Sequence, residues 1–537
     1  MTALLHPGVY VQEIPSGART IEGAPTGTAI FVGETERGPI GPTRIIGRND
    51  YERLFGGYMR ARDGGLDPTP VLMKYAIEGF FANGGSQAFV LRAMDEWDTP
   101  ALTATRDSRT SGNPILIESS SPGVWGNSVR ITFAASTDAD GSRFRIAVFY
   151  TSPEDGVERW VEDWDRLSID SGDENFVVDV LRRSLFIRWF EATAPVLPAL
   201  DDNSAGPTEA TLAGAAVALD EGVGGGSALA DADFPALFER LAEVSDAALM
   251  VAASDRQLPG LDVSVTDSDG YVSFTNLFVD YVLLRPLQDL FLVGELPALS
   301  NELDPVSAAV DHARGTGGAT QSTASNYNGL YWPHIEIADP IGAGSNATRV
   351  IPPGGHVAGL YARTDLRRGV WKAPAGTEAT LSGVRRLSFD VLDVHQDNLN
   401  PQGINALRRI AGAGLVSWGA RTRQPSSEWR YVPVRRTAIF LRHSIYNGIQ
   451  WAVFEPNGDG LWASLRATVG AFMETQFRNG AFAGTTSREA YFVKCDAETT
   501  TEIDRTAGIV NVLVGFAPLR PAEFVVVKLS QKVALEA

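Results

Sequence analysis

The chain has 537 residues and a formal net charge of −19, and a length of this size is expected to form about three or four domains. So acidic a composition argues against a nucleic-acid-binding protein, which would need a basic face. The single cysteine, Cys495, excludes an intramolecular disulfide framework. The most apolar stretch, residues 277–299, is too charged to span a membrane, and no secretory signal is recognisable at the start.

Residues 21–92 alternate between strand and helix. Apolar runs predict a buried strand at 28–32, helices at 49–55 and 71–81, and a second strand at 87–92. We expect an asparagine or aspartate to cap the first of these helices. This segment therefore predicts the start of an α/β domain.

Residues 93–230 change character and are predicted to form an inserted, mostly-β module. Alternation with a period of two indicates short strands at 129–134 and 144–150, and another strand is expected at 156–164. The stretch 194–226 is rich in alanine, glycine, aspartate and proline, which is typical of a linker. We expect this module to face outward.

An α/β pattern returns over residues 231–400, with a helix predicted at 234–241 and a buried strand at 247–252. Together with residues 21–92, this segment is expected to form a central α/β domain. The predicted fold is therefore a mixed α/β (α+β), multidomain one.

Residues 401–520 are predicted to form a further α/β domain. Its clearest element is an amphipathic helix in which Leu461, Leu465 and Val469 recur at helical spacing, with Asp459 as the expected cap. Such a helix usually faces the core of its own domain.

Strand-forming segments stand at both ends of the chain. After β-type runs at 491–496 and 509–518, prolines interrupt the strand, and residues 521–537 are predicted to form a C-terminal strand arm. Residues 1–20 are predicted to form a matching N-terminal arm. Since an unpaired strand needs a partner, the arms predict strand addition between copies of the chain. The arm residues expected to pair are Val9, Tyr10, Val11, Ile14, Phe524, Val525, Val526, Val527 and Leu529.

Positive charge is concentrated in residues 401–470, which hold nine arginines and three acidic residues. One interpretation is that these arginines pair with acids of the same fold. The other is that they form an electropositive surface that meets an acidic partner.

The sequence contains none of the common motifs of catalysis or cofactor binding. Its histidines form no His-Glu-x-x-His pair, and the glycine run at 222–226 lacks the lysine of a phosphate-binding loop. We therefore expect no catalytic, metal-binding or cofactor-binding residues. The enzyme alternative is a serine hydrolase, because the surroundings of Ser345 distantly resemble those of a subtilisin serine, with His312 and His334 upstream.

Several blocks of the sequence resemble contractile tail sheath proteins. They cover about residues 1–92 and 325–530 and include Pro7-Gly-Val-Tyr-Val-Gln-Glu-Ile-Pro15, Pro352-Pro-Gly-Gly-His-Val-Ala-Gly359, Gly369-Val-Trp-Lys-Ala-Pro-Ala-Gly376, Trp451-Ala-Val-Phe-Glu-Pro-Asn457 and Glu489-Ala-Tyr-Phe-Val-Lys-Cys-Asp496. A match this long and ordered is specific.

The resemblance implies a structural subunit rather than an enzyme. Sheath subunits form stacked six-fold rings around an inner tube protein, and they associate with baseplate and terminator or cap proteins. Contraction from a metastable extended lattice drives the tube through a target envelope. The resemblance also implies that the domain at 401–520 faces the tube. The candidate tube-facing residues are Arg408, Arg409, Arg421, Arg423 and Arg466.

The implied setting is assembly in the bacterial cytoplasm into a phage tail or tail-like particle, which can be released from the cell. The resemblance leaves open whether that particle is a phage tail, a bacteriocin-like particle or a contractile injection system. The nearest structural alternative is a tail-tube or baseplate protein, which the length of the chain and its terminal blocks disfavour. No membrane insertion is expected.

Overall fold

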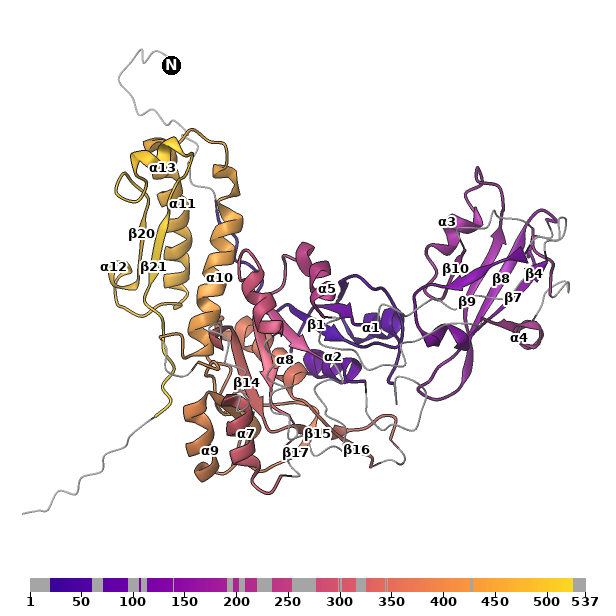
Figure 1. Cartoon of the computed structure of the whole chain (residues 1–537), viewed down its shortest axis with the longest axis horizontal. Helices are drawn as coiled ribbons and strands as arrows, with labels where there is room; N and C mark the ends of the chain where they lie inside the picture. The colour runs from indigo at the N-terminus through magenta and orange to yellow at the C-terminus, as the bar shows by residue number, and fades with distance from the viewer. Residues whose placement is uncertain are drawn as a thin grey trace, which may run out of the picture. The chain divides into compact units, whose positions relative to one another are not determined.

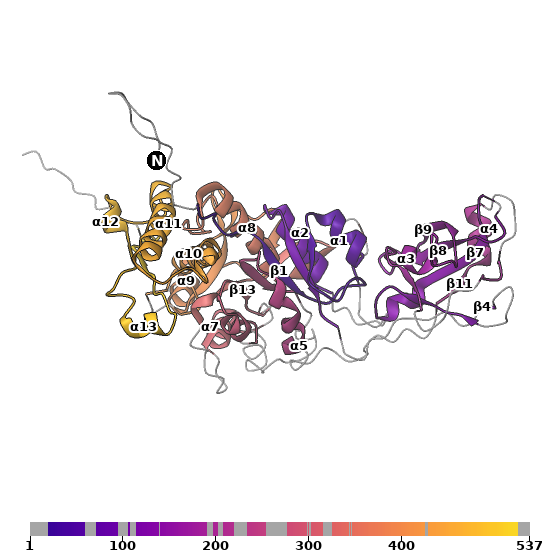
Figure 2. The same ribbon diagram turned by 90° about the horizontal axis from the view of Figure 1, so that it is seen from above.

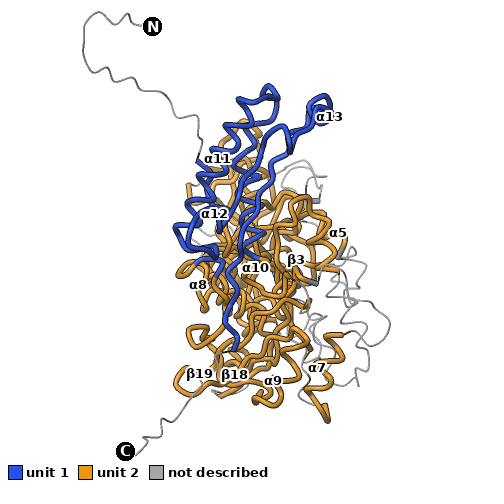
Figure 3. The backbone as a smooth tube through the Cα atoms, turned by 90° about the vertical axis from the view of Figure 1, so that its left-hand side faces the viewer, with its two compact units in different colours: residues 1–24, 369–371, 436–537 blue, residues 25–368, 372–435 orange. Residues whose placement is uncertain are grey.

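The computed structural model describes residues 20–59, 71–94, 106–107, 114–138, 140–190, 197–201, 208–219, 234–253, 277–297, 299, 302–314, 325–342, 344, 346–424 and 428–524. The chain divides into two compact units (Figure 3). Unit 1 comprises residues 1–24, 369–371 and 436–537, and unit 2 comprises residues 25–368 and 372–435. The mixed α/β, multidomain fold is confirmed. The finer division into domains by residue range stays a prediction.

Unit 2 is built on an eight-stranded sheet (Figure 1). Its inner strands are parallel, and each edge strand is antiparallel to its neighbour. Strand β1 is buried along its whole length, so its sequence Ala-Ile-Phe-Val-Gly is apolar throughout. In spatial order the strands are β19 (Gly414–Ser417), β18 (Ile404–Ile410), β14 (Asn328–Trp332), β13 (Phe291–Glu295), β12 (Leu249–Ala252), β1 (Ala29–Gly33), β3 (Ala88–Arg92) and β2 (Thr43–Ile45).

Helices pack around this sheet, and α2 and α8 pack closely against each other beside it (Figure 2). Glycine permits that approach, because a β-carbon at Gly355 would lie 2.3 Å from the carbonyl oxygen of Ala76. The helices of this part of unit 2 are α1 (Arg48–Phe55), α2 (Met73–Ala82), α5 (Phe234–Glu239), α7 (Pro305–Arg314), α8 (Gly354–Arg368) and α9 (Asp393–Leu399). A small sheet beside them contains β15 (Ile335–Ala338), β16 (Thr348–Ile351) and β17 (Val384–Leu387).

Different helices cover the two faces of the large sheet. Leu330 and Trp332 on β14 belong to a buried cluster with α7 and with Leu399 of α9. Tyr331, between them, points to the opposite face, where its hydroxyl lies 2.7 Å from the hydroxyl of Tyr361 on α8. Helices α7 and α9 therefore lie on one face of the sheet, and α8 lies on the other.

The inserted module contains an antiparallel sheet with the strand order β11-β7-β8-β9 and a pair of strands, β6 and β10. It has its own core, in which Trp125, Phe133, Phe144 and Trp189 are buried. Its elements are β4 (Arg106–Asp107), β5 (Pro114–Ile115), β6 (Ile117–Ser119), β7 (Val129–Ala135), β8 (Phe144–Thr151), β9 (Glu158–Leu167), α3 (Val177–Leu181), β10 (Ile187–Trp189), α4 (Glu209–Ala215) and β11 (Val217–Ala218). The module is mostly β.

Buried polar contacts join the module to the central sheet within unit 2. The Tyr150 hydroxyl donates to Glu36, and the Arg37 guanidinium lies 4.4 Å from the centre of the Phe186 ring. Arg92 donates to the carbonyl oxygen of Pro122 at 2.9 Å. Since buried polar groups are costly unless paired, these contacts favour one defined attachment of the module.

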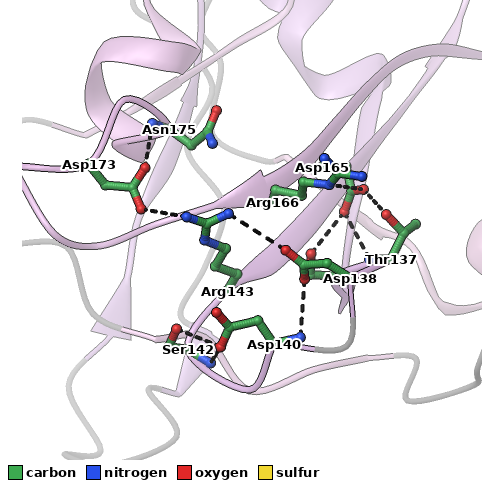
Figure 4. A network of polar contacts seen from close by, with 10 residues as sticks. Thr137, Asp138, Asp140, Ser142, Arg143, Asp165, Arg166, Asp173 and Asn175 are labelled. Carbon is green, nitrogen blue, oxygen red and sulfur yellow. Dashed lines mark hydrogen bonds and ion pairs between the residues drawn. The ribbon is translucent and has the colours of Figure 1, made fainter.

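An acidic surface network holds the turns of the module (Figure 4). Arg143 Nη2 lies 3.0 Å from Asp173 Oδ2, and Arg143 Nη1 lies 3.6 Å from Asp138. The backbone N–H of Asn175 donates to Asp173 at 2.9 Å and lowers the pKa of that carboxyl group. The carboxylates of Asp138 and Asp173 therefore stabilise turns of the module.

Unit 1 consists of long helices and a two-stranded sheet. Its core contains Leu441 of α10, Phe472 and Met473 of α11, and Phe482. A second cluster joins Leu461 and the N-terminal part of α11 to the buried Cys495. The elements are α10 (Val432–Gly448, of which the first turn belongs to unit 2), α11 (Asp459–Arg478), α12 (Ser487–Ala490), β20 (Tyr491–Lys494), α13 (Glu502–Thr506) and β21 (Leu513–Phe516).

Candidate assembly surfaces

Strands β20 and β21 form a short antiparallel hairpin-like sheet in unit 1. Tyr491 pairs with Phe516, and Phe492 pairs with Gly515. Within the described residues this sheet has no third strand, and no backbone hydrogen bond reaches the outer edge of either strand. Open edges of this kind can accept a strand from another chain.

One face of this small sheet is anchored to the helices behind it. Tyr491, Val493, Val514 and Phe516 pack against the core that includes Phe472 of α11. The sheet is therefore held in place by the fold of unit 1 before any partner strand arrives.

The other face is open and carries Lys494 beside two apolar residues. Those residues, Phe492 and Leu513, are 53% and 52% exposed. The Phe492 ring covers Gly515, where a β-carbon would lie 2.2 Å from the ring. Sequence reasoning identified both strands but did not single out these residues, although the alternation along 491–494 was the available signal.

The predicted arms fall almost entirely outside the described residues. Phe524 is described and is 77% exposed, and residues 521–524 do not form a strand within the chain. The other predicted arm residues, Val9, Tyr10, Val11, Ile14, Val525, Val526, Val527 and Leu529, lie outside the described part of the chain.

Arg408 and Arg409 are neighbours on β18, and their side chains have different surroundings. Arg408 Nη2 lies 2.7 Å from Asp393 Oδ1, and only 12% of the Arg408 side chain is exposed. Its Nε also donates to the carbonyl oxygen of Val391 at 3.0 Å. Arg409 is exposed. Of this pair, only Arg409 has a side chain available to a partner.

Arg421 and Arg423 are buried in unit 2. Arg421 Nη1 donates to the carbonyl oxygen of Asn400 at 2.9 Å, and the backbone N–H of Arg423 donates to the carbonyl oxygen of Asn328 at 2.8 Å. Arg421 is thus held by a backbone carbonyl oxygen of its own unit. Neither of these two bonds involves an acidic side chain, so the pairing of these two arginines with acids stays a prediction.

Arg466 lies in unit 1, on α11, and is exposed. Its guanidinium donates to the carbonyl oxygen of Cys495. The candidate tube-facing arginines are thus divided between the two units.

The residues of the hydrolase alternative do not form a catalytic arrangement in the described structure. His334 is buried, and its Nε2 lies 2.8 Å from the carbonyl oxygen of Leu296. His312 is buried on α7, and Ser345 lies outside the described residues. At the C-terminal ends of the parallel strands, where such sheets commonly bind ligands, the cavity beside Glu295 has a volume of about 10 Å³, enough for about one water molecule.

Among the described residues, no group of three or more histidine, cysteine or acidic side chains is arranged to hold a metal ion. None of the described helices is long and apolar enough to cross a membrane.

Two family models match adjacent parts of the chain. Residues 306–423 match the central domain of the phage tail sheath protein, and residues 424–532 match the phage tail sheath C-terminal domain. The matched region therefore includes α7 to α9, the buried arginines of unit 2 and the β20–β21 sheet.

Curated relatives carry the same description. The chain is 32% identical over 183 residues to a tail sheath protein of Burkholderia phage BcepMu, which covers 32% of this chain and 37% of that protein. It is 32% identical over 131 residues to a tail sheath protein of Vibrio phage KVP40, which covers 24% of this chain and 20% of that protein. The chain thus spans well under half the length of these relatives in each match.

Solved structures resemble the chain over nearly its whole length. One is the sheath complex of an extracellular contractile injection system, PVC, in the contracted state, with a TM-score of 0.56 and 22% identity over 99% of both chains. Another is the helical sheath of the anti-feeding prophage in the contracted state, with a TM-score of 0.54 and 22% identity over 99% of this chain and 100% of that chain. A sheath tail protein from Listeria innocua has a TM-score of 0.55 and 12% identity over 93% of this chain and 96% of that chain. At these identities the resemblance shows the fold.

Proposed function

We propose that this chain belongs to the contractile tail sheath family and is the structural subunit of a contractile sheath. Two features support the proposal. The family's central and C-terminal domains follow each other without a gap over residues 306–532. The fold resembles that of sheath subunits along 99% of the chain.

The observation that carries the proposal is the open β20–β21 sheet. We propose that the N-terminal arm of one neighbour and the C-terminal arm of another add strands to its edges. Each added strand would form main-chain hydrogen bonds, and the apolar surface at Phe492 and Leu513 would contact its side chains. Because the donating and accepting surfaces differ, the contact is head-to-tail and can continue into a helical tube.

Contraction would then require two packings of the same folded subunits. The strand mesh would keep neighbours connected while their bodies rotate between an extended and a contracted lattice. Energy stored in the metastable extended lattice would drive the inner tube through a target envelope. No cofactor or bound fuel is needed in this scheme.

The partners in this proposal are further copies of the chain in six-fold rings, an inner tube protein, a baseplate, and terminator or cap proteins. Structures that share the fold include a sheath complex and a baseplate of the anti-feeding prophage. For the contact with the tube, Arg409 and Arg466 are the candidates with exposed side chains. Their positive charge suits an acidic tube surface.

The setting we propose is a phage tail or tail-like particle that is assembled in the bacterial cytoplasm. The similar proteins come from phage tails and from an extracellular contractile injection system. Either setting uses the same subunit function.

Electron microscopy of the purified chain, alone and with its inner tube protein, tests this function. We expect helical tubes of regular diameter from the full chain. A variant lacking residues 1–15 should remain a folded monomer, because it keeps the acceptor sheet but cannot donate the N-terminal strand. Monomers from the full chain under both conditions would contradict the sheath function, and normal tubes from the truncated variant would contradict strand addition.

A further inference from the structure

A groove on unit 2 is lined by residues of helices α7 and α9. It has a volume of about 720 Å³. Its wall combines apolar side chains, such as Val310 and Phe389, with polar ones. On its rim the side chains of Leu303 and Val394 are 107% and 62% exposed. The groove is large enough to receive several side chains of a partner.

The groove is acidic. Asp304, Asp311 and Asp397 line it, and among the described residues of its lining Arg314 is the only arginine or lysine. Asp304 is occupied in capping α7, where it accepts from the Ser307 hydroxyl at 2.6 Å. Asp311 and Asp397 are exposed, and their side chains make no hydrogen bond or ion pair to another described residue. A cationic partner with an apolar contact would therefore fit this groove.

The C-terminal end of α8 has the complementary chemistry. Leu366 is apolar and 86% exposed. Arg367 and Arg368 follow it and are exposed. The Arg367 side chain has no hydrogen bond or ion pair among the described residues, and Arg368 lies 3.0 Å from the exposed Glu378. The end of α8, residues 366–368, is thus an apolar and cationic knob.

A single subunit cannot bring this knob to its own groove. The contacts of Leu330, Tyr331 and Trp332 show that α7 and α9 cover one face of the large sheet and α8 covers the other. The two surfaces therefore face away from each other across the sheet. A contact between them has to join different copies of the chain, and it is head-to-tail.

We propose that the groove between α7 and α9 receives residues 366–368 of a second copy of this chain. The contact rests on the proposed sheath assembly and adds to it a body-to-body contact that is separate from the strand arms. Asp311 and Asp397 would meet the arginines of the knob, and Leu366 would cover the apolar rim. Because the ion pairs are at the surface, salt would weaken the contact.

Cysteine cross-linking in assembled tubes tests the contact. Leu366→Cys and Val394→Cys are made in separate proteins, which are mixed before assembly and treated with a short bismaleimide. Cys495 is fully buried and gives little background. We expect a covalent dimer in the mixture and none in tubes of either variant alone. The matched control replaces Val394→Cys with Leu284→Cys. Leu284 is 81% exposed and therefore more accessible than Val394 at 62%, and it lies outside the groove.

Charge exchange provides the second measurement. Arg367→Glu and Asp397→Arg are each expected to raise the protein concentration needed for assembly by about two- to fivefold, the size expected for one exposed ion pair. The protein carrying both changes should recover most of that loss, because the pair is restored with its charges reversed.

The outcomes separate this contact from the sheath function itself. Tubes that form normally but give no cross-link, or whose charge variants assemble like the unmodified chain, overturn the contact and leave the sheath function standing. An unmodified chain that forms no tubes overturns both. Equal cross-linking in the Leu284→Cys control also overturns the contact, since it would show unspecific collision.

Discussion

His334 and His356 are fully buried, and they make the stability of the fold depend on pH. Burial lowers the pKa of His356 to about 4. It also lowers the pKa of His334 to about 4, although the carbonyl oxygen of Leu296 acts in the opposite direction. Both histidines are therefore neutral in the folded chain over most of the pH range in which an unfolded histidine titrates.

We expect the chain to lose stability as the pH falls from about 6.5 to about 4. In that window the unfolded state binds protons on these histidines and the folded state does not. Proton binding therefore stabilises the unfolded state relative to the folded state. Each histidine contributes up to about 3 kcal/mol to this loss. Denaturant unfolding of the monomer at several pH values measures it.

The variant His356→Gln should show a smaller loss of stability across the same window, since it removes one of the buried groups that cause the loss. The matched control is His395→Gln, because His395 is only half-buried. A pH dependence in His356→Gln that equals that of the unmodified chain would contradict this account.

The packing of α2 against α8 depends on two glycines of α8, Gly355 and Gly359, which have no side chain. A β-carbon at Gly355 would lie 2.3 Å from the Ala76 carbonyl oxygen, and one at Gly359 would lie 2.3 Å from the Phe80 carbonyl oxygen. Neither backbone oxygen can move without separating the two helices. The glycines therefore set the distance between α2 and α8.

We predict that Gly355→Ala destabilises the chain by about 1–3 kcal/mol, through overpacking between two helices. Gly470→Ala, in the middle of α11, is the matched control, because nothing lies within 4 Å of a β-carbon there. That change should be stabilising by about 0.5–1 kcal/mol, since alanine is the better helix former. Chemical unfolding of the two variants measures both effects, and changes of the same sign would contradict the packing argument.

The elements with strong periodicity were predicted well from the sequence. The strand expected at 28–32 is β1, and the spacing of Leu461, Leu465 and Val469 correctly predicted α11. The predicted helix caps were wrong. The N-cap residues are Gly47 and Gly458, because α1 begins at Arg48 and α11 begins at Asp459 itself. Asp50 instead accepts from the backbone N–H of Ile46 at 3.1 Å.

For the whole molecule, head-to-tail strand addition makes a specific prediction about mixtures. A chain lacking residues 525–537 keeps the acceptor sheet and loses the C-terminal donor. Added to the full chain at a low ratio, it should bind the ends of growing tubes and stop them, since nothing can continue from a copy without its donor strand. Electron microscopy should show shorter tubes as the ratio rises.

The control for that mixture is the same truncated chain with the Phe492→Asp change, which weakens the acceptor surface and should shorten tubes less. Tubes whose length does not respond to the truncated chain would contradict the head-to-tail mechanism.

The sequence by itself predicted the resemblance to contractile tail sheath proteins, the mixed α/β fold and the strands β20 and β21, because these depend on local order and periodicity. The role of the arms, the domain boundaries and the tube contact stay predictions. Only the tertiary structure decided which arginines are exposed. Arg409 is exposed, whereas Arg421 is buried and donates to the carbonyl oxygen of Asn400, and nothing in the local sequence distinguishes the two. It also decided that the knob of α8 and the groove of α7 and α9 lie on opposite faces. Both facts depend on contacts between residues far apart in the chain, which local patterns do not encode.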